Sequence, residues 1–295
     1  MCKGKGLVEY AAATREWKRL SVCFLGVLVL FTGVAVARQN EDTIRAPLSP
    51  TGRFYLSQYV PHHEDVTWSF GADGYMTFLE GHGLRAWFGV AYRQRAGWDD
   101  EATITVFDPR YIDSYQFLSA RYQTGKRATF FLHMRRVCFH LIDARTSGST
   151  FWTHAGFGLG TTSPADLYGH SVRIQREGRR NALDGYVFTG PFIHGGPVSI
   201  LGNNPLWQWE TGLYGSWHHR LSSNLLLKVS GTADLLMLTP AAEVRYRWRS
   251  ALQAGLVVVG RGNGAILAGM EYTLHDDYPE RDLPVGQRIV LEYAF

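Results

Sequence analysis

Long hydrophobic runs are missing from the chain after its first 37 residues. Of the 295 residues, only the segment 20–37, LSVCFLGVLVLFTGVAVA, is apolar over a length of 18. A membrane-spanning helix needs about 20 such residues. The mean hydropathy of the chain is −0.14, which excludes a bundle of membrane helices. If the remainder crosses a membrane, it must do so as the strands of a closed sheet.

After its N-terminal segment, the chain also has little cysteine and no marked excess of one charge. Cys2 and Cys23 belong to the N-terminal segment, so Cys138 is alone in the remainder and no disulfide can form within it. Residues 38–295 contain 25 basic and 24 acidic side chains, which gives no electrostatic reason to expect nucleic acid as a partner. Nearly all of the basic residues there are arginines, which suit paired networks.

The first 37 residues have the features of a secretory signal peptide. Lys18 and Arg19 precede the apolar run, and the A-x-A sequence that ends at Ala37 offers a cleavage site. We therefore predict export with cleavage near Ala37, although 18 apolar residues could also remain as a membrane anchor. Residues 38–64 are predicted to be an irregular periplasmic lead-in, within which FYLSQYV (54–60) could form a short extra strand.

Strand-like alternation fills most of the remaining sequence. In the C-terminal segment RIVLEYAF, every second residue from Ile289 to Phe295 is apolar. An apolar face toward lipid and a polar face toward a lumen are typical of an outer-membrane β-barrel. A soluble sandwich would alternate in the same way, but the export signal, the strand lengths and the terminal aromatic residue favour the barrel. We expect Tyr293 and Phe295 to act as the assembly signal.

We therefore predict an all-β fold, a single antiparallel transmembrane β-barrel of about 12 strands (10–14) over residues 65–295. Two consecutive long connections, 163–181 and 195–205, cannot lie on the same side of it. Either one strand is miscounted or one periplasmic connection is long. The predicted strands are 65–80, 82–96, 112–124, 127–143, 150–162, 182–194, 206–220, 223–238, 241–250, 251–261, 264–275 and 287–295.

The predicted strand 127–143, RATFFLHMRRVCFHLID, does not alternate cleanly. A bulge at Arg135-Arg136 would restore the alternation and point Arg136 and His140 into the lumen. Without it, an arginine would face lipid at a cost of about 2–4 kcal/mol near the midplane. These side chains could form a site or a polar lattice that pairs across the barrel. The predicted lumen or pore-lining residues are Asp73, Arg85, Arg93, Arg95, His133, Arg136, His140, Glu210, Lys228, Asp234, Arg245, Arg247 and Glu271.

The same strand resembles a known sequence pattern. After Y-x-x-G-K at 122–126, the chain reads H-x-x-R-V-x-x-H-L-x-D from His133 to Asp143. This is similar to a family of bacterial outer-membrane barrels of unknown function, whose central strand carries H-x-S-x-H-L-x-D. Cys138 stands at the serine and Arg136 at the first histidine, whereas the H-L-x-D part matches. The resemblance implies a barrel and brings no activity.

Three other segments could carry chemistry. WHHRLSSN offers His218, His219, Ser222 and Ser223, with Glu210 on the same face as His218, but the spacing matches no hydrolase motif and there is no G-x-S-x-G. HDDYPERD (275–282) is acidic enough for Ca²⁺ but lacks the D-x-D-x-D-G pattern. The basic segment 163–181 could contact lipopolysaccharide phosphates or fold inward as a constriction. In GFGLG, three glycines share one face, which makes room for an inward plug or relieves crowding.

We expect a non-enzymatic, porin-like protein of the bacterial outer membrane. It would be a narrow channel, or a structural or interaction barrel, with an arginine-rich lumen that prefers anions if open. One alternative is a lipid-modifying hydrolase of the lipid A deacylase or phospholipase type. The other is a soluble periplasmic barrel or sandwich. The expected partners are outer-membrane lipids, lipopolysaccharide and the barrel-assembly machinery, with no cofactor, metal or nucleic acid.

Overall fold

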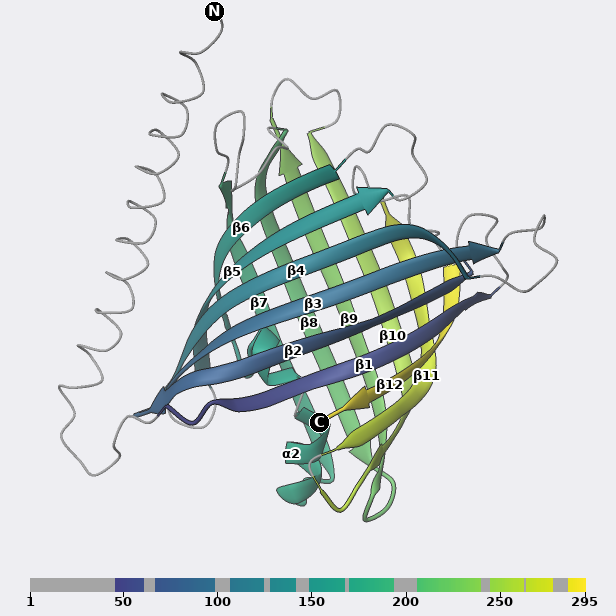
Figure 1. The fold of residues 1–295 in the computed structure, drawn as a ribbon. Coiled ribbons are helices and arrows are strands. Elements are labelled where there is room, and N and C mark those ends of the chain that lie inside the picture. The colour runs from purple at the N-terminus through teal and green to yellow at the C-terminus, as the bar shows by residue number, and fades with distance from the viewer. Residues whose placement is uncertain are drawn as a thin grey trace, which may run out of the picture.

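A closed barrel of twelve antiparallel strands forms the described part of the computed structural model (Figure 1). Each strand pairs with its neighbours along the chain, and β1 pairs with β12 to close the sheet. Neither helix in the described ranges is long and apolar enough to cross a membrane. The structure describes residues 46–60, 67–98, 107–124, 128–141, 149–167, 170–193, 206–239, 245–262, 264–277 and 286–295.

The strands are between 9 and 18 residues long, which is enough to cross the hydrocarbon of a membrane at a tilt. A short 3₁₀ helix, η1 (Pro164–Leu167), and the α-helix α2 (His170–Arg176) follow β6. The strands are β1 (Ser49–Val60), β2 (Trp68–Gly81), β3 (Leu84–Trp98), β4 (Phe107–Thr124), β5 (Ala128–Leu141), β6 (Ser149–Gly160), β7 (Asn181–Ile193), β8 (Trp207–Arg220), β9 (Leu225–Leu238), β10 (Tyr246–Val259), β11 (Ala265–Asp276) and β12 (Gly286–Ala294).

The predicted fold class is confirmed. The predicted number of strands is also right, but only because two errors cancel: one strand was missed and another was counted as two. β1 lies inside the segment predicted as a lead-in, so the barrel begins at Ser49 rather than at residue 65. The predicted strands 241–250 and 251–261 are one strand, β10. The pairing of β10 with β11 shifts register between Ser250 and Ala251, so a bulge rather than a turn breaks the alternation there.

The two ends of the barrel differ in their connections. We call the end where β1 begins and β12 finishes the terminus end, and the opposite end the far end (Figure 1). At the terminus end the connections after β2, β4, β8 and β10 are short, between two and five residues. The connection after β6, residues 161–180, is the long exception and carries both helices. The long connection 161–180 therefore lies at the terminus end, among the short connections, which explains why two consecutive connections are long.

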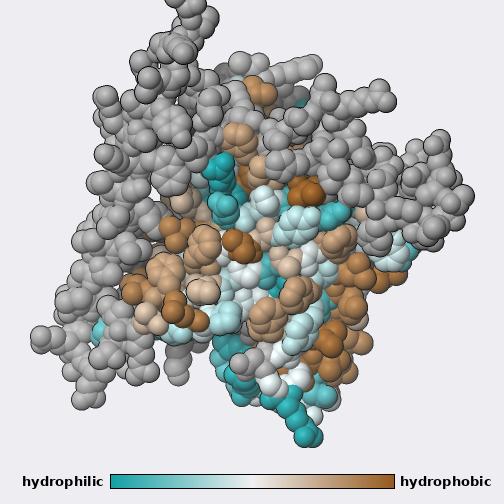
Figure 2. Space-filling model, in the orientation of Figure 1, coloured by the Kyte–Doolittle hydropathy of each residue, from teal (hydrophilic) through white to brown (hydrophobic). Residues whose placement is uncertain are grey.

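The outer wall is apolar, as the alternation predicts. On β12, Ile289 and Leu291 are each 51% exposed, whereas Val290 between them is buried in the lumen. Large exposed hydrophobic residues recur at every second position of the other strands, for example Leu252 and Leu256 on β10. Figure 2 shows such apolar side chains spread across the described strands of one face. In a membrane, this wall would face lipid.

The seam between β1 and β12 is completed by the last residue. The Phe295 N–H donates to the Gly52 carbonyl at 2.9 Å, and the Gly52 N–H donates to the Phe295 carbonyl at 3.0 Å. The Phe295 ring stacks on Phe54 with centroids 5.8 Å apart. A Cβ at position 52 would lie 2.5 Å from the Asp73 carbonyl oxygen and 3.0 Å from the Phe295 ring, so only glycine fits. Tyr293 lies beside Phe295 on the outer wall.

Replacing Phe295 with Ser should lower the yield of heat-modifiable barrel in the outer membrane by roughly two- to tenfold. That range corresponds to the loss of one aromatic pair at the seam, about 0.5–1.5 kcal/mol. Semi-native electrophoresis of membrane fractions measures the yield. Phe157→Ser is the control, because Phe157 is an exposed aromatic residue of the outer wall away from the seam. Equal yields from the two variants would show that closure does not depend on the Phe295 ring.

Candidate functional site in the barrel lumen

The connection after β6 folds into the lumen at the terminus end. A carboxylate oxygen of Asp166 in η1 lies 3.2 Å from a guanidinium nitrogen of Arg121, and the other lies 3.9 Å from Arg85. Ala165 is buried in a cluster with Tyr75 of β2 and Trp87 of β3. Of the two arrangements considered from the sequence, the structure therefore has the inward one.

The helix α2 is fixed to the barrel wall next to η1. His170 Nε2 lies 2.9 Å from the Asp184 carboxylate of β7, and Ser171 Oγ lies 3.3 Å from His218 Nε2 of β8. Val172 packs on a buried apolar cluster supplied by β9–β12. Together, η1 and α2 narrow the terminus end of the lumen (Figure 1).

Buried polar contacts occupy the middle of the lumen. Arg135 of β5 forms an ion pair with Glu210 of β8, which is 0% exposed. His133 Nδ1 lies 2.5 Å from Ser119 Oγ. His154 Nε2 donates to the Gly190 carbonyl at 3.1 Å. The Arg135–Glu210 pair spans the interior from β5 to β8, whereas the other two contacts join neighbouring strands, β4 to β5 and β6 to β7. The predicted polar lattice is therefore present at this level.

The glycines of the GFGLG segment make this packing fit. Gly156 and Gly158 face the lumen, because they pair with the inward His133 and Phe131 of β5. A Cβ on Gly156 would lie 2.7 Å from the His154 ring, and one on Gly158 would overlap the Phe131 ring. The glycines therefore relieve crowding among large inward side chains, which was one of the two predicted roles.

The predicted bulge in β5 is absent. β5 pairs with β4 and β6 without a shift in register, and Val137 is buried in the lumen beside Trp152 and Trp207. Arg136 and Cys138 therefore lie on the outer wall, and the prediction that Arg136 lines the lumen was wrong. The alternation seemed broken because the far half of the lumen holds an apolar core, which accepts Val137 as an inward residue.

On the outer wall, the charge of Arg136 is partly compensated by neighbouring side chains. Its guanidinium lies 5.4 Å from the centre of the Phe151 ring, and its cross-strand neighbour is the exposed Gln116. The apolar core in which Val137 takes the inward position consists of Ala91, Tyr115, Val137, Phe139, Trp152, Phe192, Trp207, Leu236 and Leu238.

The other predicted lumen residues divide between the interior and the rim. Asp234 lies 2.5 Å from Arg249, and Glu271 lies 2.5 Å from Arg288, both inside the barrel. Arg247 shares the inward face of β10 with Arg249. Arg245, in contrast, is exposed just before β10 begins. The side chain of His140 lies outside the described part of the structure, as do residues 1–45, residues 61–66 and most of HDDYPERD.

The predicted hydrolase cluster does not converge. His218 is buried in the lumen against α2, whereas His219 is on the outer wall and bonds to Asn181. Ser222 bonds to Asn224 within the turn after β8. Glu210 is engaged by Arg135. Among the described residues, no three His, Cys, Asp or Glu side chains are grouped as a metal site.

A cavity of about 390 Å³ remains in the lumen on the side of β1–β3 and β7–β12. It extends from Arg95 and Asp276, near the far end, to Pro164 and Leu167 of η1. Three acidic side chains line it, Glu271, Asp276 and Glu292. Six basic side chains line it, Arg53, Arg93, Arg95, Lys228, Arg249 and Arg288.

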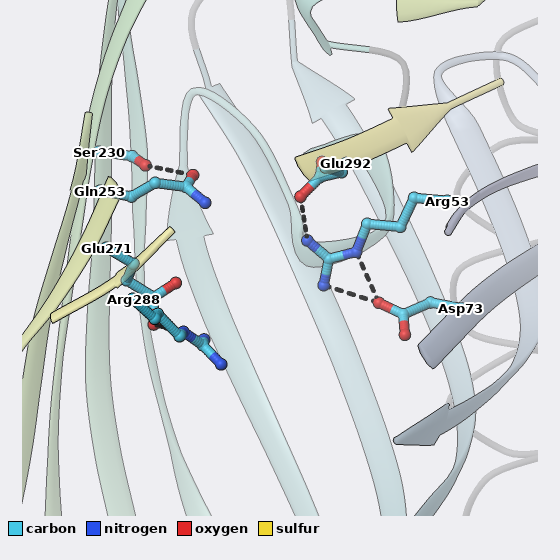
Figure 3. Close-up of polar contacts among 7 residues, drawn as sticks. All are labelled: Arg53, Asp73, Ser230, Gln253, Glu271, Arg288 and Glu292. Carbon is cyan, nitrogen blue, oxygen red and sulfur yellow. Dashed lines mark hydrogen bonds and ion pairs between the residues drawn. The ribbon is translucent and has the colours of Figure 1, made fainter. Parts of the chain in front are cut away.

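Most of these basic side chains form ion pairs with carboxylates of the barrel. Arg53 bridges Asp73 at 2.7 Å and Glu292 at 3.1 Å, as Figure 3 shows. Arg95 contacts Asp113 at 2.7 Å. Arg249 and Arg288 have the carboxylate partners given above. The cavity wall is therefore positive mainly where an arginine or lysine has no such partner.

Two of the six basic side chains that line the cavity, Arg93 and Lys228, have no ion pair among the described residues. The Arg93 guanidinium lies 5.8 Å from the Tyr55 ring centre and 5.1 Å from that of Tyr115. Its Nε atom is buried without a hydrogen-bond partner. Lys228 faces the same cavity from β9. The inward position of Arg93 and Lys228 was predicted from the sequence, but their lack of partners was not.

Arg53, Tyr55 and Arg288 are site residues that the sequence reasoning missed. Arg53 and Tyr55 fell in the segment taken as a lead-in, and Arg288 alternates with Ile289 at the start of RIVLEYAF. The alternation of FYLSQYV was the available signal, because it continues back through Arg53.

Comparisons with known proteins are limited to remote structural similarity. No protein-family model matches the chain, and no curated protein sequence is similar to it. LpxR from Salmonella typhimurium is 9% identical with a TM-score of 0.47, and the match covers 84% of this chain and 99% of that one. The β domain of the Bordetella autotransporter BrkA is 9% identical with a TM-score of 0.44, covering 83% and 98%. OmpT of Vibrio cholerae is 7% identical with a TM-score of 0.40, covering 88% and 98%.

Removing the carboxylate of Glu210 should lower the free energy of unfolding by about 3–5 kcal/mol, because Arg135 would stay buried without its partner. Glu210→Ala is compared with Arg136→Ala, which removes a charge from the lipid-facing outer wall and should therefore not lower the free energy of unfolding. Urea unfolding in lipid vesicles, followed by tryptophan fluorescence, measures both. A larger loss from Arg136→Ala would contradict the unbulged β5 and restore the inward Arg136.

Proposed function

We propose that the protein is a non-enzymatic barrel of the bacterial outer membrane that admits small anions into its lumen and acts as a narrow channel. The observation that carries this proposal is the cavity, where six basic side chains face three acidic ones and Arg93 and Lys228 have no ion pair among the described residues. A lumen lined in this way attracts anions and repels cations.

The apolar outer wall and the two kinds of end support the membrane location. Outer-membrane barrels have short periplasmic turns and longer outer loops. On this basis the terminus end would face the periplasm, and lipid and lipopolysaccharide would surround the wall. Insertion would require the barrel-assembly machinery. The inward η1–α2 connection would then be the constriction that an anion must pass before it leaves the cavity.

The hydrolase alternative has one feature in its favour, the contact between Ser171 and His218. A serine hydrolase also needs a carboxylate on the second nitrogen of the histidine. His218 Nδ1 has no hydrogen-bond partner among the described residues, and Asp184 contacts His170 instead. Because His218 is only 1% exposed, a lipid ester would not reach it in this arrangement.

Reversal potentials of single channels in planar bilayers under a KCl gradient test the proposal. The wild-type protein should prefer chloride. The double variant Arg93→Glu with Lys228→Glu should move the permeability ratio toward potassium by about fivefold or more, since each reversed charge contributes on the order of 1 kcal/mol. Unchanged selectivity in this variant, or a folded wild-type barrel that never conducts, would contradict the proposal.

Arg261→Glu is the matched control for these measurements. It makes the same change of charge in the exposed turn between β10 and β11, away from the cavity. Its permeability ratio should stay close to that of the wild-type protein.

A further inference from the structure

We infer that the lumen cavity is a binding site for an acidic sugar, a monosaccharide-sized ring that carries a carboxylate or a phosphate. The inference rests on the proposed entry of anions into the lumen and specifies what the cavity would retain. Three features of the lining carry it: an arginine without an ion pair among the described residues, a row of neutral hydrogen-bonding groups, and tyrosine rings that line the same cavity.

The anionic group of the ligand would bind at Arg93. This guanidinium has no ion pair among the described residues and its Nε is unpaired, so it would gain a partner without losing one. Arg288 borders the same cavity and lies 5.9 Å from the centre of the Tyr59 ring. A guanidinium presents paired N–H donors that match the two oxygens of a carboxylate or phosphate.

The hydroxyl groups of the ligand would bind on β8–β10. Ser230, Thr232 and Gln253 line the cavity there, together with Tyr214. The Ser230 hydroxyl donates to Gln253 Oε1 at 3.4 Å, a long bond that leaves the Gln253 amide N–H groups for a ligand. Figure 3 shows Gln253 and Arg288 on one side of the space that Arg53 and Glu292 border from the other.

The cavity is too large for a simple anion and too polar for an apolar acid. Its 390 Å³ would hold roughly ten or more water molecules, so chloride or acetate would leave most of it hydrated. Tyr186 and Tyr214 stack with centroids 5.4 Å apart and both line the cavity. Aromatic faces suit the C–H face of a sugar ring, while Glu271 and Glu292 can accept hydrogen bonds from its hydroxyls.

Calorimetric titration of the full-length mature barrel in detergent micelles tests the site with defined probes. Galacturonate and glucose 6-phosphate represent the two acidic sugars, galactose the neutral ring, and acetate and inorganic phosphate the isolated anions. We expect at least one acidic sugar to bind about tenfold or more tightly than galactose and than its own isolated anion. Comparison of the two acidic sugars identifies whether the carboxylate or the phosphate is preferred.

Two variants separate the halves of the site. Arg93→Gln should weaken binding of the acidic sugar by about tenfold and leave galactose unchanged, because it removes a charge-assisted contact. Gln253→Ala should weaken the acidic sugar severalfold and leave acetate and phosphate unchanged. Arg136→Gln and Gln116→Ala are the matched controls on the outer wall and should bind like the wild-type protein. Heat-modifiable migration confirms that each variant is folded.

Failure of this inference is distinguishable from failure of the proposed function. Acidic sugars that bind no more tightly than acetate or phosphate, or a Gln253→Ala variant with wild-type affinity, would overturn the sugar site. If the channel still prefers chloride in that case, the proposed function stands alone. If the wild-type channel shows no anion preference in bilayers, the proposed function fails as well.

Discussion

Closure of the sheet at β1 and β12 is the constraint on which the rest of the structure depends. A strand edge facing lipid would leave backbone N–H and C=O groups unpaired, at several kcal/mol each. Eight residue pairs from Arg53 to Val60 remove that edge, and the terminal Phe295 extends the seam by two more hydrogen bonds. Closure in this register determines which residue of every pair on the wall faces inward. Each inward position is then part of a narrow interior that has to be filled.

Filling that interior divides the lumen into layers with different chemistry. Near the far end, the side of β4–β9 is closed by apolar rings such as Trp152 and Trp207. The middle is crossed by the buried pair Arg135–Glu210, and the terminus end is narrowed by η1, which Asp166 links to two arginines. The cavity is the space that these layers leave unfilled on the opposite side of the lumen. Its charge is therefore a consequence of how the remaining space is packed.

The sequence predicted the wall better than the interior. Period-two alternation has one strong cause, the contrast between lipid and lumen, so the C-terminal strand and most others were assigned to the correct faces. That contrast weakens wherever the lumen is apolar, which is why Arg136 was assigned inward. The inward connection after β6 follows from contacts between Asp166 and arginines of distant strands, and spacing along the chain carries no record of them.

The number of arginines in the lumen does not by itself determine the electrostatic potential there. Arg53, Arg95, Arg249 and Arg288 each have a carboxylate within about 3 Å, and such pairs stabilise the interior while contributing little net potential at a distance. The basic side chains without such partners dominate what an entering ion would meet, and Arg93 lies among tyrosine rings without an ion pair to any described carboxylate. A row of arginines in a barrel sequence therefore indicates a paired lattice first. Selectivity depends on the few positions that the lattice leaves unpaired, and these emerge only when all the strands are brought together.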